Sequence, residues 1–125
     1  MLTQGDHRPE VLVIEANAIV AVDIAETVAL HMPQARISRV SSPEAALARL
    51  TLADLPPDLV LVGVSAERMA RSGLGEVLRA RSMRVVLIGD QTLEAEAPPQ
   101  GWLRLDKPFT TDMLEAVLRQ AWACA

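Results

Sequence analysis

The sequence predicts an α/β fold with a doubly wound, parallel sheet of five strands. Three short apolar runs, at 11–14, 59–62 and 85–88, are typical of strands buried on both faces of a parallel sheet. Segments with helical spacing of apolar residues alternate with them, which implies right-handed crossovers and helices on both faces. The 125 residues fit one domain. We therefore expect a flexible tail over 1–8 and a single domain over 9–125.

The first two helices follow the first two strands. A helix over 17–30 is expected to turn its apolar positions toward the sheet, with Thr27 on its polar face beside two acids. A weaker, alternating strand follows at 35–40. The next helix has the clearest start in the chain, with Ser42 as N-cap and Pro43 at the first helical position.

The second half of the chain contains weaker patterns. The spacing of apolar residues predicts a third helix over 74–81 and a last strand over 102–105. A last helix is expected to begin near Thr110 or Thr111. Between the fourth and fifth strands, prolines and a glycine leave room for about one helical turn, so the fourth helix is expected to be short or missing.

Composition excludes several classes of protein. A net charge of -4 argues against a protein that binds nucleic acid by neutralising phosphates. The single cysteine cannot form an internal disulfide bond. The apolar stretch over 11–30 is interrupted by Glu15, Asp23 and Glu26, which are costly in lipid, and the polar start is no signal peptide. We expect a cytoplasmic protein with neither a nucleic-acid nor a membrane partner.

Three segments resemble those of a response-regulator receiver domain, the flavodoxin-like module of bacterial two-component signalling. They are VLVIE at 11–15, PDLVLV at 57–62 and KPFT at 107–110. The resemblance implies a flavodoxin-like (βα)5 fold with a site at the carboxyl ends of the strands. In this family, a carboxylate after the first strand and an aspartate ending the third hold Mg²⁺. The aspartate accepts a phosphoryl group, whose oxygens bind a hydroxyl after the fourth strand and a lysine after the fifth.

The chain departs from this pattern at most of these positions, so it resembles a degenerate pseudo-receiver. The remnant of the phosphorylation pocket comprises one acid, one lysine and four residues without a reactive side chain: Glu15, Lys107, Ala16, Gly63, Ile88 and Gly89. Gly63 stands at the acceptor position, and glycine cannot form an acyl phosphate. The short interval from Ile88 to Lys107 is similar to that of a compact subgroup common in alphaproteobacteria.

One carboxylate beside one lysine is a poor site for Mg²⁺, which usually binds one or two carboxylates in octahedral geometry. We therefore expect no Mg²⁺, no other cofactor and no catalytic residue. Glu15 is predicted either to pair with Lys107 in a metal-free pocket or to point to solvent. Lys107 itself is either functional or only part of a structural turn.

Two alternatives stay open at this site. Asp90 or Asp106 could supply a replacement acid. Ser65 could be a relocated acceptor or only a helix cap. A relocated acceptor at Asp90 or Ser65 would make the chain a phosphorelay receiver. Alternatively, the space vacated at Gly63 and Ala16 could admit a small ligand.

The interpretation that the sequence favours is a stand-alone, non-enzymatic receiver that acts by phosphorylation-independent protein–protein contact. The expected partners are a sensor histidine kinase, a response regulator or a transcription factor, or a second copy of the chain. The expected interaction surface joins the last strand, the last helix and the shortened fourth-helix region, and includes Arg104, Met113 and Trp122.

Overall fold

The computed structural model describes residues 9–52, 56–81, 83–89, 102–106 and 109–123. Five parallel strands form one sheet in the order β2–β1–β3–β4–β5. The strands are β1 (Glu10–Ile14), β2 (Arg36–Val40), β3 (Leu59–Val62), β4 (Val85–Gly89) and β5 (Leu103–Asp106). The helices are α1 (Ala18–His31), α2 (Pro43–Leu52), α3 (Ala66–Ser72), α4 (Leu74–Ala80) and α5 (Thr111–Ala123).

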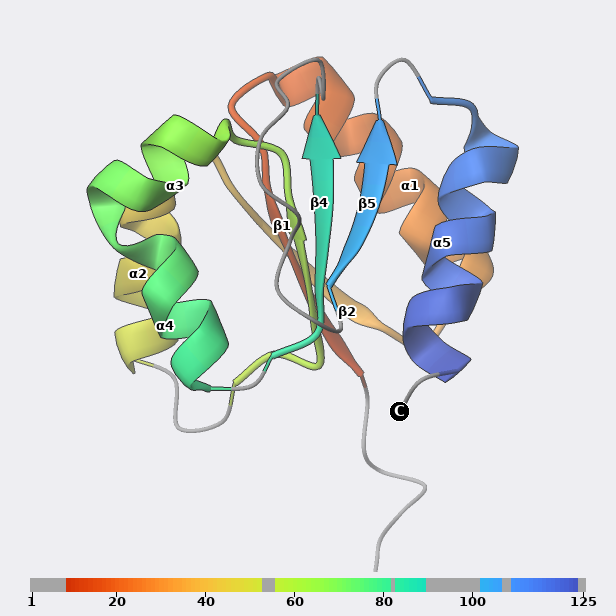
Figure 1. Cartoon of the computed structure of the whole chain (residues 1–125). Coiled ribbons are helices and arrows are strands. Elements are labelled where there is room, and N and C mark those ends of the chain that lie inside the picture. The colour runs from red at the N-terminus through yellow and green to blue at the C-terminus, as the bar shows by residue number, and fades with distance from the viewer. Residues whose placement is uncertain (1–8, 53–55, 82, 90–101, 107–108, 124–125) are drawn as a thin grey trace, which may run out of the picture.

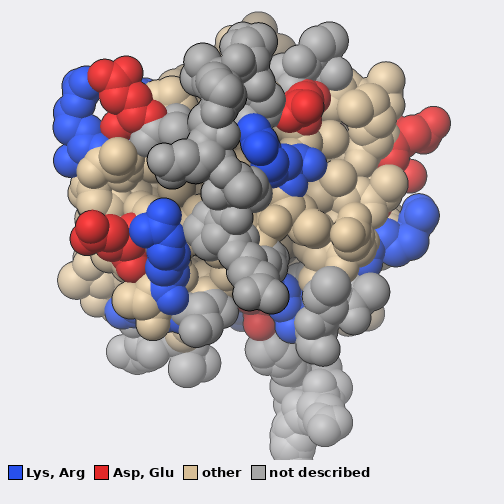
Figure 2. All heavy atoms as spheres, viewed as in Figure 1, with Lys and Arg blue, Asp and Glu red and all other residues tan. Residues whose placement is uncertain are grey.

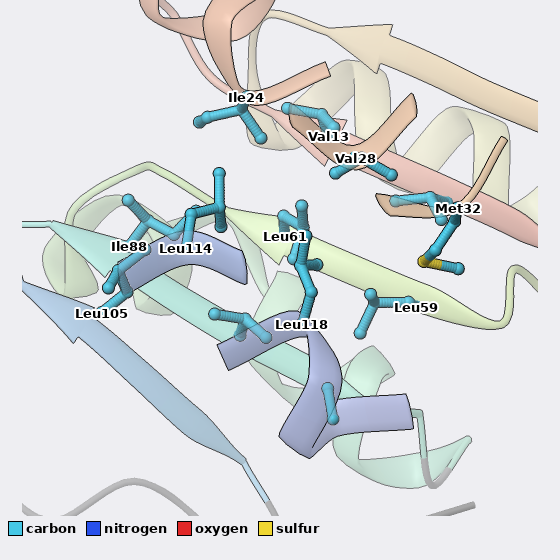
Figure 3. Close-up of a cluster of buried hydrophobic side chains, with 13 residues drawn as sticks. Val13, Ile24, Val28, Met32, Leu59, Leu61, Ile88, Leu105, Leu114 and Leu118 are labelled. Atoms are coloured by element: carbon cyan, nitrogen blue, oxygen red, sulfur yellow. The ribbon is translucent and has the colours of Figure 1, made fainter. Parts of the chain in front are cut away.

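Helices cover both faces of the sheet, with α1 and α5 on one face and α2, α3 and α4 on the other (Figure 1). Alternate residues of each central strand supply two separate cores, because successive strand side chains point to opposite faces. Leu61 and its neighbours pack with Leu114 and Leu118 of α5 on the first face (Figure 3). Val60 and Val62 pack with α2, α3 and α4 on the second. The predicted doubly wound, flavodoxin-like sheet is confirmed.

Side-chain caps begin the first two helices. The Asn17 side-chain oxygen accepts hydrogen bonds from the backbone N–H groups of Ile19, at 2.9 Å, and Val20, at 3.2 Å. Ser42 Oγ accepts one from the Ala45 N–H at 3.1 Å, and Pro43 is the first residue of α2. The helix start predicted at Ser42 is therefore confirmed.

The third predicted helix, over 74–81, corresponds to α4 in the structure. Only α4 was predicted, and α3 precedes it, with Ser65 Oγ accepting a hydrogen bond from the Arg68 N–H at 3.2 Å. Gly73 separates the two helices in the left-handed region, at φ 80°. The pattern did not predict α3 because, among the side chains that the structure describes in this mostly polar segment, Met69 alone belongs to the second core.

Two smaller expectations were also wrong. Thr27 is buried and is not part of the polar face. Burial is possible because the Thr27 hydroxyl donates a hydrogen bond to the Asp23 carbonyl oxygen of the same helix at 3.0 Å. The last strand begins one residue later than predicted, at Leu103. The predicted tail over 1–8 and the short fourth helix between β4 and β5 lie outside the described residues. Among the described helices, none is long and apolar enough to cross a membrane.

Candidate functional site

The candidate site lies where β1 and β3 end side by side in the middle of the sheet. Ile14 of β1 pairs with Val62 of β3, so Glu15 and Gly63 follow two paired residues at the same edge. After β1 the chain continues to α1 on one face of the sheet, and after β3 it continues to α3 on the other face (Figure 1). Such a point is the usual place for ligands in open α/β folds. The structure therefore brings together two of the predicted site residues that are far apart in the sequence.

Glu15 is held inside this corner. Its backbone N–H donates to the Val40 carbonyl oxygen at 3.0 Å, which extends the β1–β2 pairing by one residue. The residue is only 6% exposed, and its Oε2 accepts a hydrogen bond from the Asn17 backbone N–H at 3.1 Å. The prediction that Glu15 points to solvent is therefore wrong. Acidic side chains are rarely buried to this extent unless they have partners.

Gly63 lies directly beneath the carboxyl group of Glu15. Its backbone N–H donates to the Ile14 carbonyl oxygen at 2.7 Å. A Cβ added to Gly63 would overlap Glu15 Oε1, and would lie 3.1 Å from both Glu15 Cδ and the Ile14 carbonyl oxygen. Among the described glycines only Gly73 has a positive φ, so the Gly63 backbone does not require glycine. The requirement at residue 63 is space for Glu15.

The Glu15–Gly63 contact changes the interpretation of the vacated pocket. The side chain of an acceptor at position 63 would begin where Glu15 Oε1 now lies. A side chain from the neighbouring strand end therefore fills the Gly63 part of the space that a small ligand was predicted to use. The other part, beside Ala16, is exposed.

The remaining pocket positions separate into a core residue and residues at the rim. Ile88 is buried in the first core with α1 and α5, so it is a packing residue. Gly89 and Asp106 end β4 and β5 as paired residues, and Asp106 is exposed. Lys107 and Asp90 lie outside the described residues, so the predicted pairing of Glu15 with Lys107 stays a prediction.

Ser65 acts as the helix cap that was one of its two interpretations. It is exposed, and its hydroxyl oxygen is engaged by the N-terminus of α3. Within the described part of the chain, no group of three or more His, Cys, Asp or Glu side chains could hold a metal ion. The expectation that Mg²⁺ does not bind stays a prediction, because Asp90 is not among these residues.

Arg104 and Met113, two of the predicted interaction residues, lie on different elements, and the predicted interaction surface stays a prediction. Arg104 lies between Leu103 and Leu105, which pack toward α1 and α5. Alternation along the strand therefore puts Arg104 on the opposite side of the sheet, whereas Met113 is 42% exposed on α5. The side chain of Trp122 lies outside the described part of the chain. Acidic and basic side chains are interspersed on the face shown in Figure 2.

The sequence interpretation missed an apolar surface on α1. Ile19 is 81% exposed and Leu30 is 76% exposed, with the partly exposed Val22 between them. The acids Asp23 and Glu26 are exposed on the same helix. The signal was present in the sequence, since α1 has more apolar residues than the stripe facing the sheet can use.

Comparisons with known proteins identify the fold. No family model and no curated protein matches the sequence. The chain is similar in structure to the chemotaxis response regulator CheY4 of Vibrio cholerae, with 17% identity, a TM-score of 0.71, and 92% of this chain and 99% of that one covered. It is similar to a response regulator receiver protein from Sinorhizobium medicae, with 23% identity, a TM-score of 0.71, and 94% and 96% covered.

A third similar structure is a mutant of the anti-anti-sigma factor PhyR from Bartonella quintana, with 21% identity and a TM-score of 0.73. The match covers 94% of this chain and 50% of PhyR, so the chain spans about half of the length of that protein. At these identities the likeness establishes the fold, which is that of response-regulator receiver domains.

Proposed function

We propose that this chain, which has the receiver fold, is a signalling module that acts by phosphorylation-independent contact with another protein and catalyses no reaction. The observation that carries the proposal is Gly63 at the carboxyl end of the central strand β3. Phosphoryl transfer to a receiver needs a nucleophilic carboxylate at this position. Glycine has none.

The geometry of Glu15 supports the same proposal. Phosphoryl transfer depends on a nucleophile that approaches the donor in line. Glu15 is the acid nearest to the acceptor position among the described residues, but its carboxyl group is buried against Gly63 and bonded to the Asn17 N–H. To attack a donor it would first have to leave this packing.

The partner class that we propose is a signalling protein: a sensor histidine kinase, a response regulator, a transcription factor or a second copy of the chain. Receiver-fold neighbours include response regulators and an anti-anti-sigma factor, which supports this class. Exposed apolar side chains on α1 support a protein contact, because the fully buried core of a protein interface is largely apolar. Ile19, Val22 and Leu30 supply the apolar part.

The experiment is an intact-mass measurement on the full chain. The chain is incubated with Mg²⁺ and acetyl phosphate, and separately with a histidine kinase and ATP. A receiver domain that has the acceptor aspartate serves as the positive control. We expect the control to gain one phosphoryl group and the mass of this chain to stay unchanged.

A gain of one phosphoryl group by the wild-type chain would overturn the proposal. Ser65→Ala and Asp90→Asn variants would then identify the relocated acceptor, because loss of the gain in one of them assigns the group to that residue. This outcome would favour the alternative of a phosphorelay receiver with relocated chemistry.

A further inference from the structure

A single side chain connects the two loops at the candidate site. Glu15 Oε2 accepts a hydrogen bond from the Asn17 N–H in the loop that follows β1. Glu15 Oε1 lies over Gly63, at the start of the loop that follows β3. The Gly63 N–H in turn donates to the Ile14 carbonyl oxygen, so the two chain segments are also bonded through their backbones.

We propose that Glu15 is a built-in occupant of the acceptor position, which fixes both loops in one arrangement. This inference rests on the proposed function and deepens it, because a domain that is not phosphorylated needs another means of setting the loops at its strand ends. Glu15 supplies that means from within the chain. The arrangement at this corner is then constitutive, and neither phosphodonors nor divalent cations change it.

Two properties of the Glu15 side chain make it an occupant. Its length lets the end of the side chain reach the space above Gly63, and one of its oxygens accepts the Asn17 N–H. Glutamine has the same length and also offers an oxygen acceptor, but it has no charge. Alanine lacks the length, the acceptor and the charge. The proposal therefore separates from the predicted ion pair with Lys107, which requires the negative charge.

The test is amide hydrogen exchange, measured by NMR on the full chain, in four proteins: the wild type, Glu15→Ala, Glu15→Gln and the control Glu10→Ala. Glu10 is the acid at the opposite end of β1, where its Oε2 lies 3.8 Å from Arg36 Nη1. The amides of Asn17 and Gly63 report on the two loops. The amide of Leu61, in the middle of β3, reports on changes in global stability.

The expected result is specific to the site. Relative to Leu61, exchange at Asn17 and Gly63 should accelerate about tenfold in Glu15→Ala, because an N–H acceptor and its packing are lost. Glu15→Gln and Glu10→Ala should keep the wild-type protection at both amides. In the wild type, adding Mg²⁺ with beryllium fluoride should leave both amides unchanged.

Three results would overturn the inference. The first is unchanged exchange at Asn17 and Gly63 in Glu15→Ala. The second is an equal loss of protection in Glu15→Gln and Glu15→Ala, which would show that charge and not occupancy holds the loops. The third is a change of exchange in the wild type with Mg²⁺ and beryllium fluoride. The mass measurement tests the proposed function separately, so an unphosphorylated wild type with unchanged loops in Glu15→Ala would contradict this inference alone.

Discussion

Adding one methyl group at Gly63 tests the packing at the strand ends. In Gly63→Ala the new Cβ would overlap Glu15 Oε1 and approach the Ile14 carbonyl oxygen to 3.1 Å. Extra atoms in a packed site cost about 1–3 kcal/mol. Replacing glycine at a backbone conformation that alanine can adopt offsets about 0.4–1 kcal/mol through the unfolded chain. We therefore expect the free energy of unfolding to fall by about 1 kcal/mol, roughly the difference between the midpoints of these two ranges.

The same substitution should behave differently when Glu15 is alanine. With the carboxyl group gone, only the approach to the Ile14 carbonyl remains, and the gain through the unfolded chain offsets it. Gly63→Ala should then be neutral or slightly stabilising. The double-mutant cycle should give a coupling energy of about 1–2 kcal/mol between residues 15 and 63, within the range measured for side chains in contact.

Urea denaturation followed by circular dichroism measures the free energy of unfolding of the wild type, Gly63→Ala, Glu15→Ala and the double variant, provided that the m value stays constant. Gly75→Ala is the matched control, since its Cβ would meet only Met69 Cε at 3.6 Å. Because Gly75 lies within α4, alanine there should stabilise the protein by about 0.5–1 kcal/mol. A coupling energy below about 0.3 kcal/mol, the level found for independent sites, would refute the contact between Glu15 and Gly63.

Four further predictions concern the helix caps, the first core and the exposed side chains of α1. Asn17→Ala should lower the free energy of unfolding by about 1 kcal/mol, because α1 loses its N-cap; urea denaturation measures this loss, and wild-type stability would contradict the cap. Ser65→Ala should cost a similar amount, about 0.5–2 kcal/mol, and incubation with acetyl phosphate should leave the mass of this variant unchanged; wild-type stability would contradict the cap. Leu114→Ala should cost about 2–5 kcal/mol, since the side chain is fully buried between α5 and the sheet, and a loss below 1 kcal/mol would place Leu114 outside the core. Replacing both Ile19 and Leu30 by serine should leave stability within about 0.5 kcal/mol, because both are exposed; the variant should retain less partner from a native-cell extract than Met113→Ser does, and equal retention would exclude the α1 face.

The sheet was predictable from sequence because its signal is local. Each central strand is a continuous run of branched apolar residues, as burial on both faces requires. The start of α2 was predictable for the same reason, since Ser42 and Pro43 are adjacent in sequence. The receiver resemblance, carried by three short segments, implied the same topology, and the structural neighbours have this fold.

The structure of the site was less predictable because it depends on pairs of residues that are distant in sequence. Glu15 and Gly63 were each identified, but as one remaining acid and one missing acceptor. Their contact arises only when β1 and β3 pair in register. A useful signal was present, namely a long acidic side chain on one strand end and a glycine on its neighbour. The short helix α3 was missed for a different reason, since Met69 alone of its described side chains belongs to the second core.

The most direct test of the central claim is a crystal structure of the chain grown with Mg²⁺ and beryllium fluoride. Beryllium fluoride binds to a carboxylate in place of a phosphoryl group. The account predicts that no beryllium fluoride is attached to the protein, and that Glu15 Oε1 lies over Gly63 as it does here. Beryllium fluoride bonded to a carboxylate at the ends of the strands would contradict it.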